Sequence, residues 1–168
     1  TRSFVAGERT WAHSLAVVHL GQVVAACVYL PVRDKLYLAE FGSGATLNGE
    51  RLSASKESDL SKAKVLSPKV SFRQEFWVDG PPPVERHFRP SLAYRMALVG
   101  EGRFDAMITL RPAWEWDIAA GALIAEEAGA RVTDRHGERM VFNSRSRQTA
   151  GVVAGGSDVH EGLLARLA

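Results

Sequence analysis

The stretch from Trp114 to Gly121, WEWDIAAG, places a carboxylate at the start of a run of very small residues. Aspartate is a favoured N-cap and stabilises a helix by about 1 kcal/mol in that position, so Asp117 is first a candidate helix cap. A carboxylate held at a strand-to-helix junction between two tryptophans is also a good ligand for a hard cation. Both roles stay open, because one carboxylate oxygen can accept an amide while the other meets a cation.

The elements around this stretch follow from its apolar patterns and turn residues. We predict strands at residues 64–66, 104–110, 131–133 and 151–154, and helices at residues 71–78, 91–101 and 117–128. Ser91 is the expected N-cap of one helix and Gly129 the C-cap of the next, while Ser157 or Asp158 caps a final helix. This alternation of strands and helices indicates a layered α/β unit.

The first third of the chain has a different pattern. We predict strands at residues 10–20, 22–30 and 36–40, with Gly21 as the turn between the first two. The Asn48-Gly49 pair predicts a tight hairpin, and Gly42-Ser43-Gly44 fits a hairpin turn better than a phosphate loop, because no helix follows it. This part is therefore an antiparallel meander. The polar residues 53–64 mark the best boundary, so we expect two domains, residues 1–55 and 56–168.

Composition excludes several classes of site. Twenty-one basic and 19 acidic residues leave a net charge of +2, which does not argue for nucleic-acid binding. The single cysteine, Cys27, excludes an internal disulfide and a zinc site of several cysteines, and it is expected to be a buried thiol. The five histidines have no metal-ligand spacing. No membrane span or signal peptide is visible, so a cytoplasmic location is expected.

Several segments resemble the inositol monophosphatase family. WEWDIAAGALIAEEAGA is similar to its C-terminal motif, in which Trp-Asp precedes small residues and then Glu-Ala-Gly. TRSFVAG and LNGERL resemble the segment that follows the family's Asp-Pro-x-Asp-Gly-Thr motif, and SLAYRMALVGEGRFDAM resembles its helix and strand before the Trp-Asp. The resemblance covers nearly the whole chain. It implies a layered αβαβα sandwich that here lacks its N-terminal part.

The same resemblance implies magnesium-dependent, lithium-inhibited hydrolysis of small phosphate monoesters, with two or three Mg²⁺ ions in the complete enzyme. It makes Asp117 a metal ligand. Thr1 matches the threonine that orients the attacking water and lies at the phosphate. Ser91 matches a substrate-binding helix start, although a simple N-cap is equally open. The family's other ligands, a glutamate and two aspartates, precede the position of Thr1, so we expect residues 1–168 alone to be inactive.

Two positions bear on the substrate. Inositol-specific members carry a glutamate seven residues before the motif aspartate, where this chain has Leu110. The Glu115-Trp116-Asp117 motif resembles bacterial 3'(2'),5'-bisphosphate nucleotidases more than the Pro-Trp-Asp of many inositol enzymes. This favours a nucleotidase, with inositol-1-monophosphatase as the alternative.

An alternative of another class is a non-catalytic binding or regulatory protein on the same fold, such as one that contacts RNA or the transcription machinery. For the enzyme, the expected partner is a small phosphorylated metabolite, and neither a membrane nor a nucleic acid is expected. The resemblance also makes a homodimer a candidate assembly.

Overall fold

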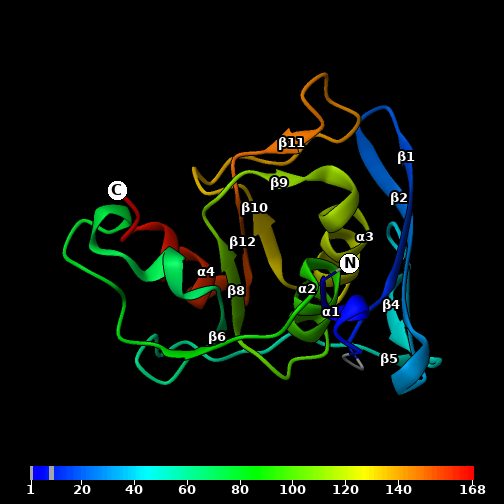
Figure 1. The fold of residues 1–168 in the computed structure, drawn as a ribbon, viewed down its shortest axis with the longest axis horizontal. Helices are drawn as coiled ribbons and strands as arrows, with labels where there is room; N and C mark the ends of the chain where they lie inside the picture. The colour runs from blue at the N-terminus through cyan, green and yellow to red at the C-terminus, as the bar shows by residue number, and fades with distance from the viewer. Residues whose placement is uncertain (1, 8–9) are drawn as a thin grey trace.

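The computed structural model describes residues 2–7 and 10–168, which form four layers (Figure 1). An antiparallel sheet is followed by a layer of helices, then by a second sheet, and then by an outer layer of short helices. This confirms the predicted α/β class, and the described residues supply four of the five layers expected of the sandwich. No helix in these residues is long and apolar enough to cross a bilayer.

The first sheet is the predicted meander, with strand order β1-β2-β3-β4-β5 and antiparallel pairing throughout. Its strands are β1 (His13–His19), β2 (Gln22–Leu30), β3 (Lys35–Glu40), β4 (Gly44–Leu47) and β5 (Glu50–Arg51), after the short helix α1 (Arg2–Val5). Leu20-Gly21 and Asn48-Gly49 are two-residue turns in which both residues have positive φ. That geometry matches the twist of a hairpin, which confirms both predicted turns.

The second sheet is mixed, with strand order β10-β12-β8-β6-β7. Its strands are β6 (Lys64–Leu66), β7 (Glu85–His87), β8 (Ala106–Thr109), β10 (Arg131–Thr133) and β12 (Val152–Gly155), and a separate ribbon pairs β9 (Ala113–Trp114) with β11 (Gln148–Thr149). Strand β6 is parallel to both of its neighbours, β7 and β8. The carboxyl ends of these three strands therefore lie at one edge of the sheet, where α/β folds usually bind ligands.

The helices are α2 (Leu92–Gly100), α3 (Glu115–Glu127) and α4 (Ser157–Leu164). Ser91 caps α2 as predicted, since its Oγ accepts a hydrogen bond from the Tyr94 amide at 3.3 Å. The predicted cap of α4 is wrong, because Gly156 is its N-cap and Ser157 is already helical. In place of a helix at residues 71–78, the chain forms two 3-10 turns, Lys69–Phe72 and Gln74–Phe76.

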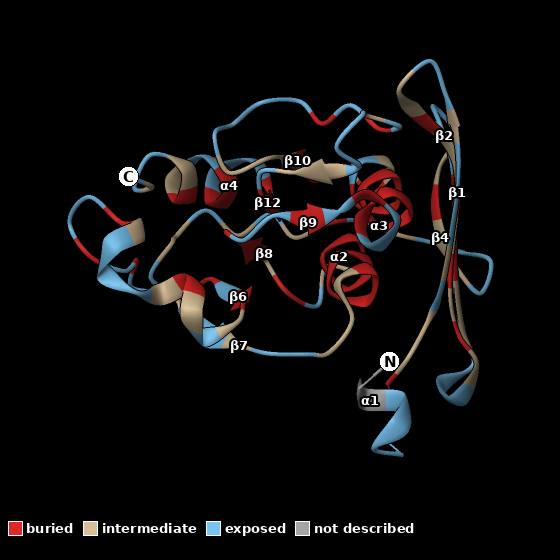
Figure 2. Ribbon diagram, turned by 45° about the horizontal axis from the view of Figure 1, so that its top comes forward, coloured by how far each residue is buried: buried red, intermediate tan, exposed pale blue. Residues whose placement is uncertain are grey.

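Helices α2 and α3 pack closely in the buried centre of the molecule (Figure 2). A Cβ added to Gly121 of α3 would lie 2.7 Å from the Met96 Cβ of α2, and one added to Gly100 would lie 3.2 Å from the Ile124 carbonyl oxygen. These contacts occur in the same order along both helices, so α2 and α3 run in the same direction. Their N-termini therefore lie at the same end.

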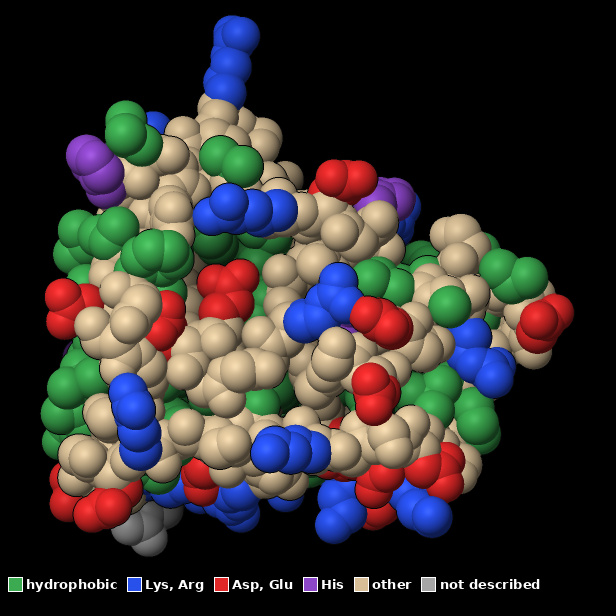
Figure 3. Space-filling view, turned by 180° about the vertical axis from the view of Figure 1, so that it is seen from behind, with side chains coloured by type: hydrophobic (Ala, Val, Ile, Leu, Met, Phe, Trp, Pro, Cys, Tyr) green, Lys and Arg blue, Asp and Glu red, His purple; other side chains and the backbone are tan. Residues whose placement is uncertain are grey.

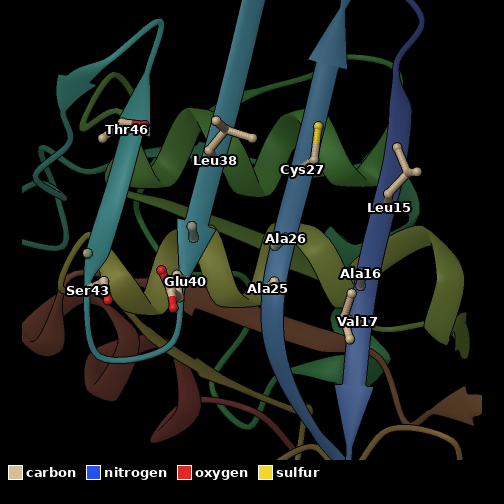
Figure 4. A pocket seen from close by; sticks show the side chains of 12 residues that line it. Leu15, Ala16, Val17, Ala25, Ala26, Cys27, Leu38, Glu40, Ser43 and Thr46 are labelled. Carbon is tan, nitrogen blue, oxygen red and sulfur yellow. The ribbon is translucent and has the colours of Figure 1, made fainter.

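The outer face of the first sheet is apolar, and no described residue covers it (Figure 4). It carries a hollow of about 600 Å³ whose lining includes Leu15, Val17, Cys27 and Leu38. Leu15 and Val17 are 60% and 59% exposed. Cys27 is half-buried on this face rather than in the core, which corrects the expectation of a buried thiol.

The domain division at residue 55 stays a prediction.

Buried His160 in α4 makes the stability of the fold depend on pH. Its Nε2 lies 3.0 Å from the Thr133 Oγ1, and its Nδ1 has no partner among the described residues. Burial lowers the pKa of His160 to about 4. The nearby charge of Arg131 also lowers this pKa, by less, and the charge of Glu161 raises it. Because the unfolded chain then binds the proton more tightly, the stabilisation is complete above pH 6.5 and is lost as the pH falls toward 4.

We expect this loss to reach about 2.5 kcal/mol between pH 7.5 and pH 4.5, since one pKa unit corresponds to 1.36 kcal/mol. Urea unfolding of the wild type and of His160→Gln at both pH values measures it. The variant should lose that part of the pH dependence. Equal pH dependence in both proteins would show that His160 does not cause it.

Candidate active site

Asp117 lies in the first turn of α3, near the end of the molecule where β8 leads through β9 into the helix. The helix begins two residues earlier than predicted, with Trp114 as its N-cap and no side-chain capping bond. The prediction that Asp117 is the N-cap is therefore wrong. Its side chain is exposed and makes no hydrogen bond or ion pair with the described residues.

Partial removal of water raises the pKa of Asp117 above its usual value. Removal of water disfavours the charged form of a carboxylate, and a nearby cation favours it. An unpaired carboxylate with a raised pKa at a helix start is thus suited to bind a cation.

Glu115, the first residue of α3, is the residue that fixes where the helix begins. Glu115 is only 6% exposed, and its carboxylate accepts hydrogen bonds from the Asn143 amide at 2.7 Å and the Ser144 amide at 3.1 Å. The Ser144 hydroxyl donates a further hydrogen bond, and the Glu115 amide donates to the Arg147 carbonyl oxygen at 3.0 Å. In the sequence alone, Glu115 bears only on the substrate class. The structure shows that it attaches residues 143–147 to the first turn of α3.

The two tryptophans of the motif lie beside Asp117 as a stacked pair. The ring centroids of Trp114 and Trp116 are 4.6 Å apart and the rings are inclined by 10°. They are 43% and 56% exposed. The Ser14 hydroxyl of β1 contacts the Trp116 carbonyl oxygen at 3.5 Å, which joins this turn to the first sheet.

Ser91 lies at the start of α2, at the same end of the helix pair as Asp117. Its hydroxyl oxygen is engaged in the cap, while the hydroxyl proton remains able to donate. Two helix N-termini that point to the same end form a region that favours an anion such as phosphate. Thr1, the third predicted site residue, lies outside the described residues.

Neither Leu110 nor Glu127 offers a free polar group to the site. Leu110 follows β8 and is buried within the apolar cluster of the second sheet, so this position presents no polar group. The carboxylate of Glu127 accepts hydrogen bonds from the Gly42 and Gly44 amides, both at 2.7 Å. The Gly42–Gly44 segment is therefore a hairpin turn, as predicted, and its amides bind the carboxylate of Glu127. Glu127 has a structural role rather than one in acid–base chemistry.

The described residues do not by themselves form a metal centre. Within residues 2–7 and 10–168 there is no group of three or more histidine, cysteine, aspartate or glutamate side chains that could hold a metal ion. Asp117 offers one oxygen ligand, and a hard divalent cation needs several. Any metal at this end of the molecule requires ligands in addition to Asp117.

Comparison with known proteins identifies the family. The model of the inositol monophosphatase family matches residues 1–168. The chain belongs to the inositol monophosphatase family, which is a family of phosphatases.

The relatives of this inositol monophosphatase family chain carry several names. The chain is 38% identical over 141 residues to a fructose-1,6-bisphosphatase/inositol-1-monophosphatase of Thermotoga maritima, and the match covers 82% of the chain and 54% of the relative. It is 34% identical over 149 residues to a putative Nus factor SuhB of Neisseria meningitidis, covering 82% and 56%. It is 30% identical over 168 residues to the inositol-1-monophosphatase of Bacillus subtilis, covering 96% and 62%.

Solved structures give the same family. The crystal structure of the extragenic suppressor protein suhB of Bartonella henselae matches with a TM-score of 0.81 and 28% identity, covering 98% of the chain and 66% of that protein. An IMPase of Thermotoga maritima matches with the same TM-score and 30% identity, covering 98% and 63%. The inositol monophosphatase family chain thus spans less than two thirds of the length of these relatives.

Proposed function

We propose that this chain is part of a metal-dependent phosphatase that hydrolyses a small phosphate monoester. In this proposal Asp117 is one metal ligand and Ser91 lies at the substrate. The observation that carries the proposal is the position of Asp117, an exposed carboxylate in the first turn of α3 that has no partner among the described residues, with the start of α2 at the same end. The names of the Thermotoga maritima and Bacillus subtilis relatives support the same reaction class.

The metal is proposed to be Mg²⁺, with two or three ions in the complete enzyme and inhibition by lithium. Such ions would neutralise the charge of the phosphate and lower the pKa of the attacking water. In this proposal Asp117 contributes one ligand to such a centre, and Thr1 orients the water. The described residues contain no group of three or more potential ligands that could complete it. We therefore propose that residues 1–168 alone do not hydrolyse phosphate esters. Magnesium-dependent phosphate release by this purified chain, suppressed by EDTA and by lithium, would contradict the proposal.

For the substrate we propose a 3'(2'),5'-bisphosphate nucleotide, with inositol 1-phosphate as the alternative. The burial of Leu110, in place of the glutamate of inositol-specific members, removes one group that could bind a polyol hydroxyl. The measurement is kcat/KM of the complete protein for adenosine 3',5'-bisphosphate and for inositol 1-phosphate. A preference of about tenfold or more for the nucleotide is expected, since a missing hydrogen-bond partner commonly costs 1–3 kcal/mol. A clear preference for inositol 1-phosphate would favour the alternative.

A binding or regulatory role on the same fold is the second candidate, because relatives of Neisseria meningitidis and Vibrio cholerae are named as Nus factors. The surface seen from behind shows basic and acidic side chains interspersed, without a large area of one sign (Figure 3). This supports the expectation that no nucleic acid binds on that face. Retention of RNA by the chain in a gel-shift assay at 150 mM salt would favour the second candidate. The homodimer and the cytoplasmic location stay predictions.

A further inference from the structure

A hollow of about 560 Å³ lies beside β7, the edge strand of the second sheet. Its apolar part is buried or half-buried and is formed by Val70, Phe72, Pro82 and Val84. The ionisable side chains that the described residues bring to its lining are all basic and exposed, namely Lys69, Arg73 and Arg86. The hollow is thus of the size that takes a small organic molecule, and the sign of its charge favours an anion.

Strand β7 shows on which face of the second sheet the hollow lies. Val84, directly before β7, packs against the apolar cluster that contains Val65 and part of α4. Arg86 lies opposite Val65 in the parallel register, so its side chain points to the same face as that of Val84. Leu66, the next residue of β6, belongs instead to the cluster that contains α3. The hollow and the helix that carries Asp117 are therefore on opposite faces of this sheet.

The wall of the hollow that the two 3-10 turns form is fixed by the rest of the chain. Trp77 is only 2% exposed, and its Nε1 donates a hydrogen bond to the Ser71 carbonyl oxygen at 2.9 Å. The centroid of its ring lies 5.8 Å from that of Phe72. The Val78 amide donates to the Arg166 carbonyl oxygen at 3.0 Å, which joins the turns to the segment after α4 (Figure 1). A ligand therefore meets a preformed surface, and this lowers the entropy cost of binding.

The basic side chains around the hollow keep most of their charge available. Lys69 makes no hydrogen bond or ion pair with the residues that the structure describes. Arg73 lies 3.9 Å from Glu75, but both side chains are 63% exposed, so this ion pair is weak. Arg86 donates from Nη1 to the Ser67 carbonyl oxygen at 3.1 Å, which is a neutral acceptor. An anion between these side chains would offset the repulsion of their like charges.

We propose that this hollow binds an organic anion whose aromatic ring lies on Phe72 and Val84 and whose carboxylate or phosphate contacts Arg86 and Lys69. The half-buried ring of Phe72 favours an aromatic ligand, because aromatic pairs gain more than their buried area alone provides. The planar guanidinium of Arg86 matches the geometry of either anionic group. A nucleotide and an aromatic carboxylate share this chemistry, and the experiment below separates them. The proposal goes beyond the proposed hydrolysis and does not depend on it.

The test is equilibrium binding to the complete protein, measured by isothermal titration calorimetry. The probe is 1-naphthoate. Naphthalene-1-carboxamide has the same rings without the charge, and acetate has the charge without the rings. The wild type is expected to bind 1-naphthoate at least about tenfold more tightly than either compound, as fits a charged hydrogen-bonded contact combined with apolar burial.

Four variants assign the binding to this hollow. Arg86→Gln and Lys69→Gln should each weaken 1-naphthoate by about tenfold and leave the carboxamide unchanged, because only the carboxylate uses their charge. Phe72→Leu should weaken both aromatic compounds. Arg51→Gln is the matched control, because Arg51 is an exposed arginine of β5 in the first sheet that also donates to a backbone carbonyl, that of Ser43 at 2.8 Å. It should bind as the wild type does.

Adenosine 5'-monophosphate separates the two sources of the anion. If Arg86→Gln weakens its binding by about tenfold as well, the hollow takes nucleotides. If the nucleotide binds equally to both proteins while 1-naphthoate does not, the hollow takes aromatic carboxylates.

Three results would overturn the proposal. They are no measurable binding of 1-naphthoate at about 1 mM, equal affinity for 1-naphthoate and its carboxamide, and wild-type affinity in both Arg86→Gln and Lys69→Gln. The melting temperature without ligand checks the fold, and Lys69→Gln should leave it unchanged. Asp117→Asn should bind 1-naphthoate as the wild type does, so failure of the proposed hydrolysis would leave this result unaffected.

Discussion

Replacing Asp117 with asparagine is expected to lower kcat/KM of the complete enzyme by about 100-fold or more while leaving the fold intact. A metal that stabilises transition-state charge contributes several kcal/mol, and about 3 kcal/mol corresponds to a factor of about 100. Asparagine keeps the shape of the side chain but removes the negative charge that a cation requires. The measurement is steady-state phosphate release at saturating Mg²⁺ by wild type and Asp117→Asn.

The stability of the variant separates a site residue from a structural one. Because partial removal of water raises the pKa of this exposed carboxylate in the folded state, ionised Asp117 lowers stability at neutral pH. Asp117→Asn should therefore melt no lower than the wild type at pH 7. Glu126→Gln, which removes an exposed acid near the other end of α3, is the control and should retain activity. A large loss of melting temperature in Asp117→Asn, with activity lost in proportion, would instead assign Asp117 to the fold.

Much of the first sheet could be predicted because local residues determine it. Gly21 and the Asn48-Gly49 pair specify tight turns, and the apolar run of β2 specifies the strand between them. Strand β7 could not be predicted in this way. Its three residues, Glu85–His87, are charged or polar and follow several prolines, and only the pairing with β6 makes them a strand.

In the site, too, features set by neighbouring residues could be predicted, and features set by residues distant in the sequence could not. The position of Asp117 in the first turn of a helix could be predicted from the small residues after it. The start of that helix could not, because Asn143 and Ser144, 28 and 29 residues away from Glu115, determine it. The burial of Arg95 in α2 could not be predicted either, since a charged residue in a helix is ordinarily exposed, whereas Arg95 is only 8% exposed.

Replacing Glu115 with alanine is expected to destabilise the protein by about 3 kcal/mol. The change leaves the Asn143 and Ser144 amides without their acceptor, and hydrogen bonds to a charged group contribute about 1.5–3 kcal/mol each. Partial exposure of residues 143–147 lets water replace some of this, which keeps the loss below the full sum. A loss of 3 kcal/mol corresponds to about 6–12 °C in melting temperature for a chain of this size. Urea unfolding and differential scanning calorimetry measure both quantities.

Two further variants define what the Glu115 carboxylate does. Glu115→Gln keeps one acceptor oxygen and should lose only about 1 kcal/mol, because it removes charge but not every hydrogen bond. Glu161→Ala removes an exposed glutamate of a surface ion pair with Arg131 and should change stability by less than about 0.5 kcal/mol.

Hydrogen exchange then locates the effect of Glu115→Ala. The Asn143 and Ser144 amides should exchange faster in the native state while the amides in the middle of α3 stay protected, because the lost contacts join the loop to the helix start. Unchanged exchange at these two amides, or a stability within 0.5 kcal/mol of the wild type, would contradict this role. Faster exchange confined to the loop would show that Glu115, rather than Asp117, attaches the first turn of α3, which leaves the Asp117 carboxylate unengaged by the fold and available to a cation.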